Sequence, residues 1–284
     1  MARPQAPRVP IARWRRDSWE RVDDAVAAEE PLQLLLNGEP LSVIMRTPGH
    51  DIELALGLLA AEHVITSLAD VAGIRISAES GEREDNIAVD DDIVESNQID
   101  VHVGAGAGRR PQRSFLSSSS CGVCGATTVE SLAHDHPPLA AGPRVEAADL
   151  PPLAHALRGG QRVFDATGGL HAAGLFTKEG ELVTLREDIG RHNAVDKIAG
   201  RALLDGRLPL ADRVLAVSGR AGYEVVQKAL AAGIPILVAV GAPSSLAVAT
   251  ATRFGMTLVG FLRDERFNVY SGRERLAGLE ATVR

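Results

Sequence analysis

The only two cysteines of the chain, Cys121 and Cys124, form a Cys-x-x-Cys motif inside a run of serine and glycine. A buried structural cysteine needs neither a second thiol at this spacing nor flexible neighbours. The segment therefore indicates a reactive or metal-binding loop. Because the sequence contains no other cysteine, all the thiol chemistry of the protein is concentrated there.

Three chemistries fit two cysteines at this spacing. A zinc site needs two further ligands, and the nearest candidates, His134 and His136, follow at a distance that no common zinc module uses. A thioredoxin-like dithiol requires a strand before the motif, whereas a serine run precedes it here. A persulfide carrier needs a thiolate, which a helix N-terminus stabilises, and Thr127 and Glu130 predict such a helix by their capping-box spacing. The spacing alone leaves all three chemistries open.

A second concentration of polar side chains occupies residues 186–197, where an expected strand passes into an expected helix. Its charged residues that could pair with one another are Arg186, Glu187, Asp188, Arg191 and Lys197. We expect Asn193 to cap the helix. Polar loops at strand ends often bind ligands, but the same charges also suit an internal salt-bridge network. His192 fits a general acid or base and equally a hydrogen-bonded interior histidine.

The last hundred residues alternate between short apolar strands and helices followed by glycine. The expected strands are residues 213–218, 236–240 and 257–261, and the expected helices are residues 194–204, 223–232 and 246–254. This order predicts a mostly parallel sheet with helices on both faces, an αβα domain. Ligands of such sheets collect at the carboxyl ends of the strands. Arg220, Arg263 and Arg266 follow these ends, where they either clamp phosphates or are ordinary surface arginines.

The N-terminal part of the chain predicts a smaller α+β domain. Asn37-Gly38 suits a type I′ turn in a hairpin of residues 32–36 and 41–46, and a helix is expected at residues 51–64. The further expected strands are residues 71–77, 87–89 and 99–103. The Gly- and Arg-rich residues 104–113 have the composition of a connector, so we expect one domain at residues 1–113 and another at residues 114–284. The first twenty residues are expected to be a frayed or docked tail.

Composition limits the classes of function. The net charge of −7 argues against general nucleic-acid binding, and the longest apolar run is too short to span a membrane. No Walker A sequence is present, and the glycines at 104, 106 and 108 do not open a helical run, so they form no dinucleotide fingerprint. Without an apolar segment after Arg15 and Arg16, we expect a cytoplasmic protein with no membrane partner.

Several separate motifs, taken in order, resemble the FdhD family of formate dehydrogenase accessory sulfurtransferases. They are residues 120–125, 167–173, 186–197, 218–220, 242–247, 261–263 and 268–270. The match extends from the Asn37-Gly38 hairpin to Tyr270. Several motifs in the right order are far more specific than any single one.

This resemblance implies a persulfide carrier. It takes sulfur from a cysteine desulfurase and passes it to the molybdenum cofactor, bis-molybdopterin guanine dinucleotide, for formate dehydrogenase. Cys121 would carry the persulfide and Cys124 would assist. The cofactor-binding residues would be Phe261, Leu262, Arg263, Asp264, Glu265 and Arg266.

The resemblance also implies a cytidine deaminase-like fold in the larger domain and a homodimer. The deaminase zinc signature is missing, so no metal is expected. The alternatives are a zinc-stabilised chaperone that escorts the cofactor without moving sulfur, and a thiol oxidoreductase.

Overall fold

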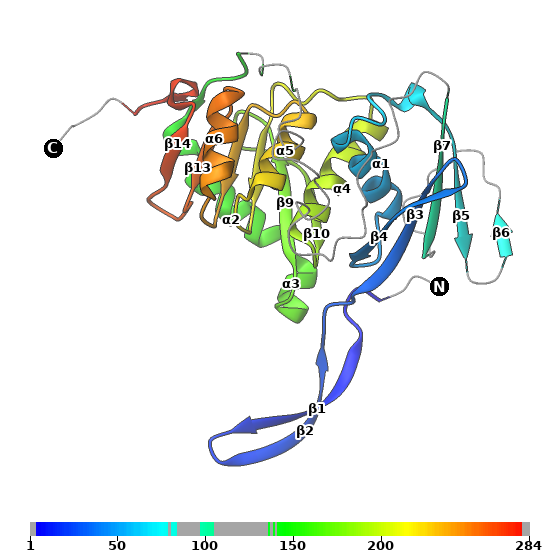
Figure 1. Cartoon of the computed structure of the whole chain (residues 1–284). Helices are drawn as coiled ribbons and strands as arrows, with labels where there is room; N and C mark the ends of the chain where they lie inside the picture. The colour runs from blue at the N-terminus through cyan, green and yellow to red at the C-terminus, as the bar shows by residue number, and fades with distance from the viewer. Residues whose placement is uncertain are drawn as a thin grey trace.

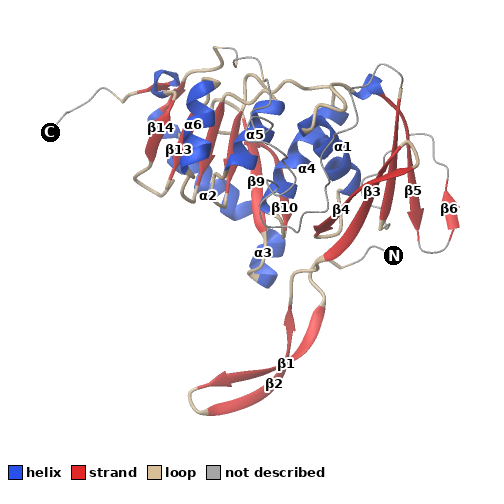
Figure 2. Ribbon diagram, viewed as in Figure 1, coloured by secondary structure: helices blue, strands red, loops and turns tan. Residues whose placement is uncertain are grey.

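The computed structural model describes residues 4–78, 81–83, 97–104, 136, 139 and 141–279. Within these ranges the chain is a mixed α/β protein with a six-stranded sheet, a five-stranded sheet and two short two-stranded sheets (Figure 2). The predicted boundary near residue 113 and the predicted strand at residues 87–89 lie outside the described residues.

The six-stranded sheet is the centre of the larger part of the molecule. Its strands are β9 (His171–Phe176), β10 (Leu182–Asp188), β11 (Val214–Val217), β12 (Ile236–Ala239), β13 (Thr257–Gly260) and β14 (Asn268–Ser271). The spatial order is β10-β9-β11-β12-β13-β14. The prediction of a mostly parallel sheet is corrected, because only β11, β12 and β13 run parallel. The hairpin β9–β10 and the returning strand β14 add antiparallel pairs on either side.

Helices cover both faces of this sheet, as predicted. The helices α4 (Arg191–Leu204), α5 (Tyr223–Ala231) and α6 (Ser245–Arg253) lie on one face, while α2 (Pro151–Gly160) packs on the other (Figure 1). Every residue of β11, β12 and β13 is buried, which explains their continuous apolar sequences. The short helix α3 (Arg162–Thr167) precedes β9, and β8 (Val145–Glu146) pairs with β15 (Leu276–Ala277). No helix in the described ranges is long and apolar enough to cross a membrane.

The five-stranded sheet forms the N-terminal part together with helix α1 (Asp51–Ala61). Its strands are β3 (Glu30–Leu36), β4 (Glu39–Arg46), β5 (Val71–Ala78), β6 (Gly81–Arg83) and β7 (Gln98–Val103), in the order β4-β3-β7-β5-β6. Asn37 and Gly38 both have positive φ angles, 53° and 81°, so the predicted type I′ hairpin turn is confirmed. The apolar side chains of this sheet and of α1 form a core of their own, which Leu203 of α4 joins.

Two glycines allow α1 and α4 to touch backbone to backbone. A Cβ atom on Gly57 would lie 1.8 Å from the carbonyl oxygen of Asp196, and one on Gly200 would lie 1.8 Å from that of Glu53. Any side chain at these positions would push the helices apart. The close crossing of α1 and α4 therefore joins the two parts of the molecule through a dense interface.

Residues 8–25 differ from the expected tail. They form the hairpin β1 (Arg8–Arg15) and β2 (Ser18–Ala25), which extends away from the body of the molecule (Figure 1). The turn residues Arg16 and Asp17 both have positive φ angles, as a two-residue hairpin loop requires. The alternation in residues 8–15 was the sequence signal for this strand, and the high arginine content obscured it. We call this hairpin the β1–β2 arm.

Candidate functional site

Cys121 and Cys124 lie outside the described residues, as do Thr127, Glu130 and His134. His136, the other histidine considered as a zinc ligand, is buried, and its ring centroid lies 4.7 Å from that of His63 and 5.7 Å from that of Phe254. The roles of the two thiols therefore stay sequence predictions.

The predicted cofactor segment begins where β13 ends. Phe261 has a positive φ angle of 55°, and its amide donates a hydrogen bond to the carbonyl oxygen of Gly241 at 3.1 Å. A bulky residue in this conformation is strained. Its ring is 42% exposed, whereas the next side chain, Leu262, is 1% exposed and packs in the core beneath the sheet. The strained turn therefore holds one aromatic ring at the carboxyl edge of the sheet.

The remaining four residues of this segment form a tight turn. The amide of Arg263 donates to the carbonyl oxygen of Arg266 at 2.9 Å, and Asp264 accepts a contact from His155 at 3.0 Å. The side chains of Asp264, Glu265 and Arg266 are exposed. Arg263 is exposed as well, but its guanidinium is held at the sheet edge, because Nη1 donates to the carbonyl oxygens of Val240 and Leu262, both at 2.8 Å. Of the six predicted residues, Arg263 alone lines the cavity described next.

A cavity of about 290 Å³ opens at the carboxyl ends of β11 and β12. Its lining consists of His171, Arg191, Ser218, Gly219, Arg220, Val240, Gly241 and Arg263. The loops after β11 and β12 meet there so closely that a Cβ atom on Gly241 would lie 2.7 Å from the carbonyl oxygen of Gly219. We call this the arginine cavity, since three guanidinium groups border it.

Three guanidinium groups make the lining of the arginine cavity cationic. Within the described residues, neither Arg220 nor Arg263 forms an ion pair with a carboxylate. Arg191 begins helix α4, whose N-terminal amide groups add a partial positive charge. A polar cavity with unbalanced cations at the carboxyl edge of an α/β sheet is suited to binding an anion.

The two histidines near the cavity favour their neutral forms. Burial lowers the pKa of His171, and the positive charge of Arg191 lowers it further. Burial also lowers the pKa of His192, although Glu224 opposes this shift by accepting from Nδ1 at 3.0 Å. His171 can therefore donate one N–H to a bound anion and accept a proton from solvent.

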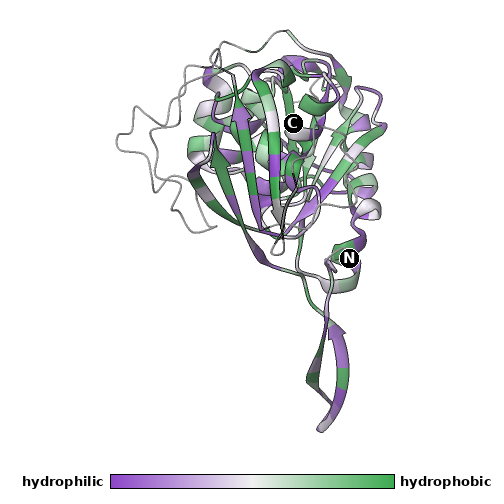
Figure 3. Ribbon diagram, turned by 90° about the vertical axis from the view of Figure 1, so that its right-hand side faces the viewer, coloured by the Kyte–Doolittle hydropathy of each residue, from purple (hydrophilic) through white to green (hydrophobic). Residues whose placement is uncertain are grey.

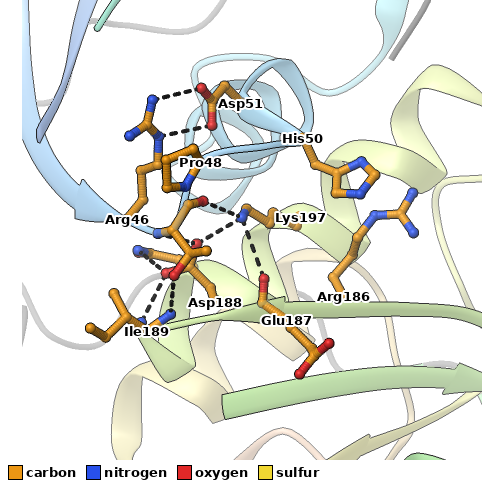
Figure 4. A network of polar contacts seen from close by, with 12 residues as sticks. Arg46, Pro48, His50, Asp51, Arg186, Glu187, Asp188, Ile189 and Lys197 are labelled. Carbon is orange, nitrogen blue, oxygen red and sulfur yellow. Dashed lines mark hydrogen bonds and ion pairs between the residues drawn. The ribbon is translucent and has the colours of Figure 1, made fainter. Parts of the chain in front are cut away.

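The polar segment of residues 186–197 forms an internal network, one of the two predicted possibilities. The Asp188 carboxylate is fully buried and accepts from the amides of Thr47 and Gly190, from Asn193 Nδ2 at 2.8 Å, and from Lys197 Nζ at 2.7 Å (Figure 4). The prediction that Asn193 caps the helix is wrong. Helix α4 begins at Arg191, three residues before the predicted start at residue 194, with Gly190 as its N-cap, and the side-chain amide of Asn193 donates to Asp188 instead.

The neighbouring ion pairs come from the end of β4 and the first turn of α1, which sequence reasoning did not single out. Arg186 forms two hydrogen bonds of 2.6 Å with Glu53. Arg46 forms two with Asp51 at 2.8 and 2.9 Å (Figure 4). Glu187 faces elsewhere and accepts from two amides at the start of α3. This network fixes the start of α4, and thereby Arg191, at the arginine cavity.

Sequence reasoning found part of the cavity and missed part of it. Arg220 and Arg263 line it, whereas Arg266, which was grouped with them, does not. His171 was not assigned to a ligand site, whereas Arg191 belonged to the polar loop of residues 186–197, for which ligand binding was one of the two possibilities. Their signal was positional, because His171 begins one strand and Arg191 begins one helix at the same edge of the sheet.

Comparison with known proteins identifies close relatives. A sulfur carrier protein FdhD of Streptomyces coelicolor is 48% identical over 271 residues, which cover 92% of this chain and 91% of the relative. The protein of the same name from Nocardia farcinica is 49% identical over 270 residues, covering 93% and 92% of the two chains.

A solved structure shares the fold. The crystal structure of a protein from Desulfotalea psychrophila, described as a formate dehydrogenase accessory protein, superposes with a TM-score of 0.74 at 26% identity. The match covers 96% of this chain and all of that chain. The family model described as FdhD/NarQ matches residues 27–277. On this evidence the chain belongs to the FdhD/NarQ family.

Proposed function

We propose that this protein is a sulfur carrier that holds sulfur as a persulfide on Cys121 and transfers it to bis-molybdopterin guanine dinucleotide for formate dehydrogenase. The arginine cavity is the observation that carries the proposal, because it offers an anionic cofactor a cationic site at the carboxyl edge of the sheet. The names of the relatives agree with a sulfur carrier. The proposal also includes a cysteine desulfurase as donor, a cytoplasmic location and a homodimer.

The side chains around the cavity suit the parts of such a cofactor. Arg220 and Arg263 match phosphate oxygens, since guanidinium groups donate two parallel hydrogen bonds to them. The exposed ring of Phe261 offers a flat surface on which a guanine base can stack. His171, in its neutral form, supplies a further donor. The cofactor is the acceptor substrate in this scheme.

Loading of Cys121 requires one exchange reaction. The Cys121 thiolate attacks the terminal sulfur of a persulfide on the donor enzyme. A bond forms between Cys121 Sγ and that sulfur, the sulfur–sulfur bond of the donor breaks, and its electron pair leaves with the donor thiolate. Cys124, three residues after Cys121, assists the release of sulfur from Cys121 by thiol exchange.

Mass spectrometry tests the loading step. After incubation with a cysteine desulfurase and cysteine, the peptide that contains Cys121 should gain the mass of one sulfur atom. Cys121→Ala should abolish the gain and the support of formate dehydrogenase, whereas Cys124→Ala should retain loading. A fully active Cys121→Ala variant would contradict the proposal. Stoichiometric zinc lost in Cys121→Ser, without any persulfide, would favour a zinc-stabilised escort chaperone, and insulin reduction would favour a thiol oxidoreductase.

Guanosine diphosphate is a suitable probe for the cavity, and calorimetry measures its binding directly. We expect Arg220→Ala and Arg263→Ala each to weaken binding by about tenfold, since each removes a charged contact worth ~1.4 kcal/mol or more. Arg253→Ala is the matched control, because Arg253 ends helix α6 and lies over the ring of Phe254, away from the cavity lining. Equal losses in all three variants would place the ligand elsewhere.

A further inference from the structure

Both tryptophans of the chain lie on the β1–β2 arm. Trp14 is 55% exposed and Trp19 is 71% exposed, more than any other large apolar side chain in the described ranges. They face each other across the two strands, so both indoles project from the same face of the arm. Large aromatic side chains in this position leave a substantial apolar surface in contact with water.

The arm stands apart from the core that holds the protein together. It projects from the body in two perpendicular views (Figures 1 and 3). At its base, the amide of Val26 donates to the carbonyl oxygen of Pro7, and the amide of Ala28 donates to that of Gln5, each at 3.0 Å. An isolated two-stranded hairpin is only marginally stable in water, and the family match begins after the arm, at residue 27. The arm is therefore not explained by the stability of the family fold.

The chemistry of the arm is that of a protein-binding surface. Pro10 and Ala12 lie on the same face as Trp14, and Arg21 lies opposite Ala12. Tryptophan and arginine are the side chains that most often dominate binding energy at protein interfaces. The charged side chains on the face of the two tryptophans are Arg8, Arg21 and Asp23, so this face has a small net positive charge, although the whole chain has a net charge of −7. A complementary partner surface has an apolar slot bordered by carboxylates.

The base of the arm lies beside the arginine cavity. A Cβ atom on Gly169 would lie 3.1 Å from that of Ala27, and His171, two residues further along, lines the cavity. In Figure 1 the arm continues beyond α3, the helix that leads into β9. A protein held by the arm is therefore next to whatever the cavity contains.

We infer that the β1–β2 arm docks the enzyme that receives the cofactor, and that this enzyme presents an apolar slot bordered by carboxylates to Trp14, Trp19 and the neighbouring arginines. The inference rests on the proposed function, because it takes the cavity as the cofactor site. Stable complexes bury about 800 Å² on each partner, and two indoles supply roughly 150–250 Å² each. The arm thus provides the anchor of a transient complex in which the cavity edge completes the contact.

Fluorine NMR isolates the arm, because labelling with 5-fluorotryptophan places the only two reporters at Trp14 and Trp19. Unlabelled, purified formate dehydrogenase apoprotein is the titrant. Both signals should shift or broaden at substoichiometric apoprotein. Signals that change instead with the concentration of the labelled protein alone would overturn the inference, since a second copy of this chain would then occupy the arm.

Variants test the energy of docking. Trp14→Ala combined with Trp19→Ala should weaken apoprotein binding by at least about tenfold in a surface-binding assay. Val43→Ala is the matched control, because Val43 is 47% exposed on β4 and should leave binding unchanged. Unchanged binding in the double variant would overturn the inference. Persulfide loading and guanosine diphosphate binding should be normal in both variants, whereas their absence in the unaltered protein would overturn the proposed function independently of the arm.

Discussion

The α1–α4 interface and the arginine cavity use charge in opposite ways. Around the α1–α4 interface, the buried guanidinium of Arg46 on β4 meets Asp51 of α1, Arg186 of β10 meets Glu53 of α1, and Lys197 of α4 meets Asp188 of β10, with contacts of 2.6–2.9 Å. In the cavity, Arg220 and Arg263 have no carboxylate partner within the described ranges, and Arg263 is held only by carbonyl oxygens.

Pairing with a carboxylate distinguishes the charges that stabilise the fold from the charges that are available to bind a ligand. Buried ions cost free energy unless they are paired, so the matched interface can close around them and exclude water. Unbalanced cations at an open edge remain solvated and attract an anion. A further buried pair, Asp196 with Lys228 at 2.7 and 2.8 Å, follows the first pattern. The carboxylate of Asp196 raises the pKa of Lys228 against the effect of burial and keeps the lysine charged.

The largest expected effect comes from breaking the interface at its closest contact. Gly57→Ala would place a methyl group against the backbone of Asp196, which cannot move without shifting a whole helix. We expect the free energy of unfolding to fall by about 4 kcal/mol, measured by urea denaturation. Gly159→Ala in α2 is the control, because no atom lies within 4 Å of its added methyl group, and a gain of about 0.5 kcal/mol is expected there. Equal changes in the free energy of unfolding for Gly57→Ala and Gly159→Ala would contradict the close contact between α1 and α4.

A smaller loss is expected when one charge of the interface is removed. Asp188→Asn leaves the Lys197 ammonium buried without its anion. The new side-chain amide also brings an NH₂ group among the N–H donors of Gly190 and Asn193, which now bond to the carboxylate. The free energy of unfolding should fall by about 3 kcal/mol. Adding Lys197→Met should restore part of the loss, because the unpaired charge is then gone. Additive losses in the double variant would show that the two side chains are not coupled.

The smallest effect concerns the cavity and depends on pH. His171 has a lowered pKa in the free protein, and a bound phosphate should raise it, so ligand binding takes up protons. Binding of guanosine diphosphate should therefore strengthen as pH falls from about 7.5 to 6, by less than about tenfold, since one pKa unit corresponds to tenfold. His171→Gln should flatten this dependence at constant salt. If His171→Gln leaves the pH dependence of binding unchanged, the proton taken up on binding belongs to another group.

Folding stability and ligand affinity change in opposite directions with pH. Because the folded-state pKa of His171 lies below its ordinary value near 6.5, its contribution to stability is present above that pH and is lost as pH falls through the folded-state value. Ligand affinity rises over the same range. Measuring both quantities on one sample separates the two effects.

Local sequence signals predicted most of the helices and strands that the structure describes. Asn37-Gly38 specified its turn, and the apolar strands β11, β12 and β13 alternated with helices as expected. These signals depend on a few neighbouring residues, so they can be interpreted without knowing how the rest of the chain folds. The αβα covering of the sheet followed from the apolar composition of its strands.

Long-range contacts decided the remainder. The contacts of Asp188 with Thr47 join residues far apart in sequence, and no local pattern encodes them. The arm was mistaken for a tail because its charged residues hid a period of two. Arg263 and Arg266 are close neighbours in sequence, yet only Arg263 lines the cavity, because its guanidinium reaches the carbonyl of Val240 across the sheet edge.

The sequence by itself determined the Cys-x-x-Cys motif, the alternation of β11, β12 and β13 with helices, and the resemblance to a sulfurtransferase family, since each depends on residue identity and spacing. Only the tertiary structure decided which charges are neutralised and which remain available. The physical reason is that an arginine becomes structural or ligand-binding through its neighbours in space, and burial and pairing are properties of the folded chain.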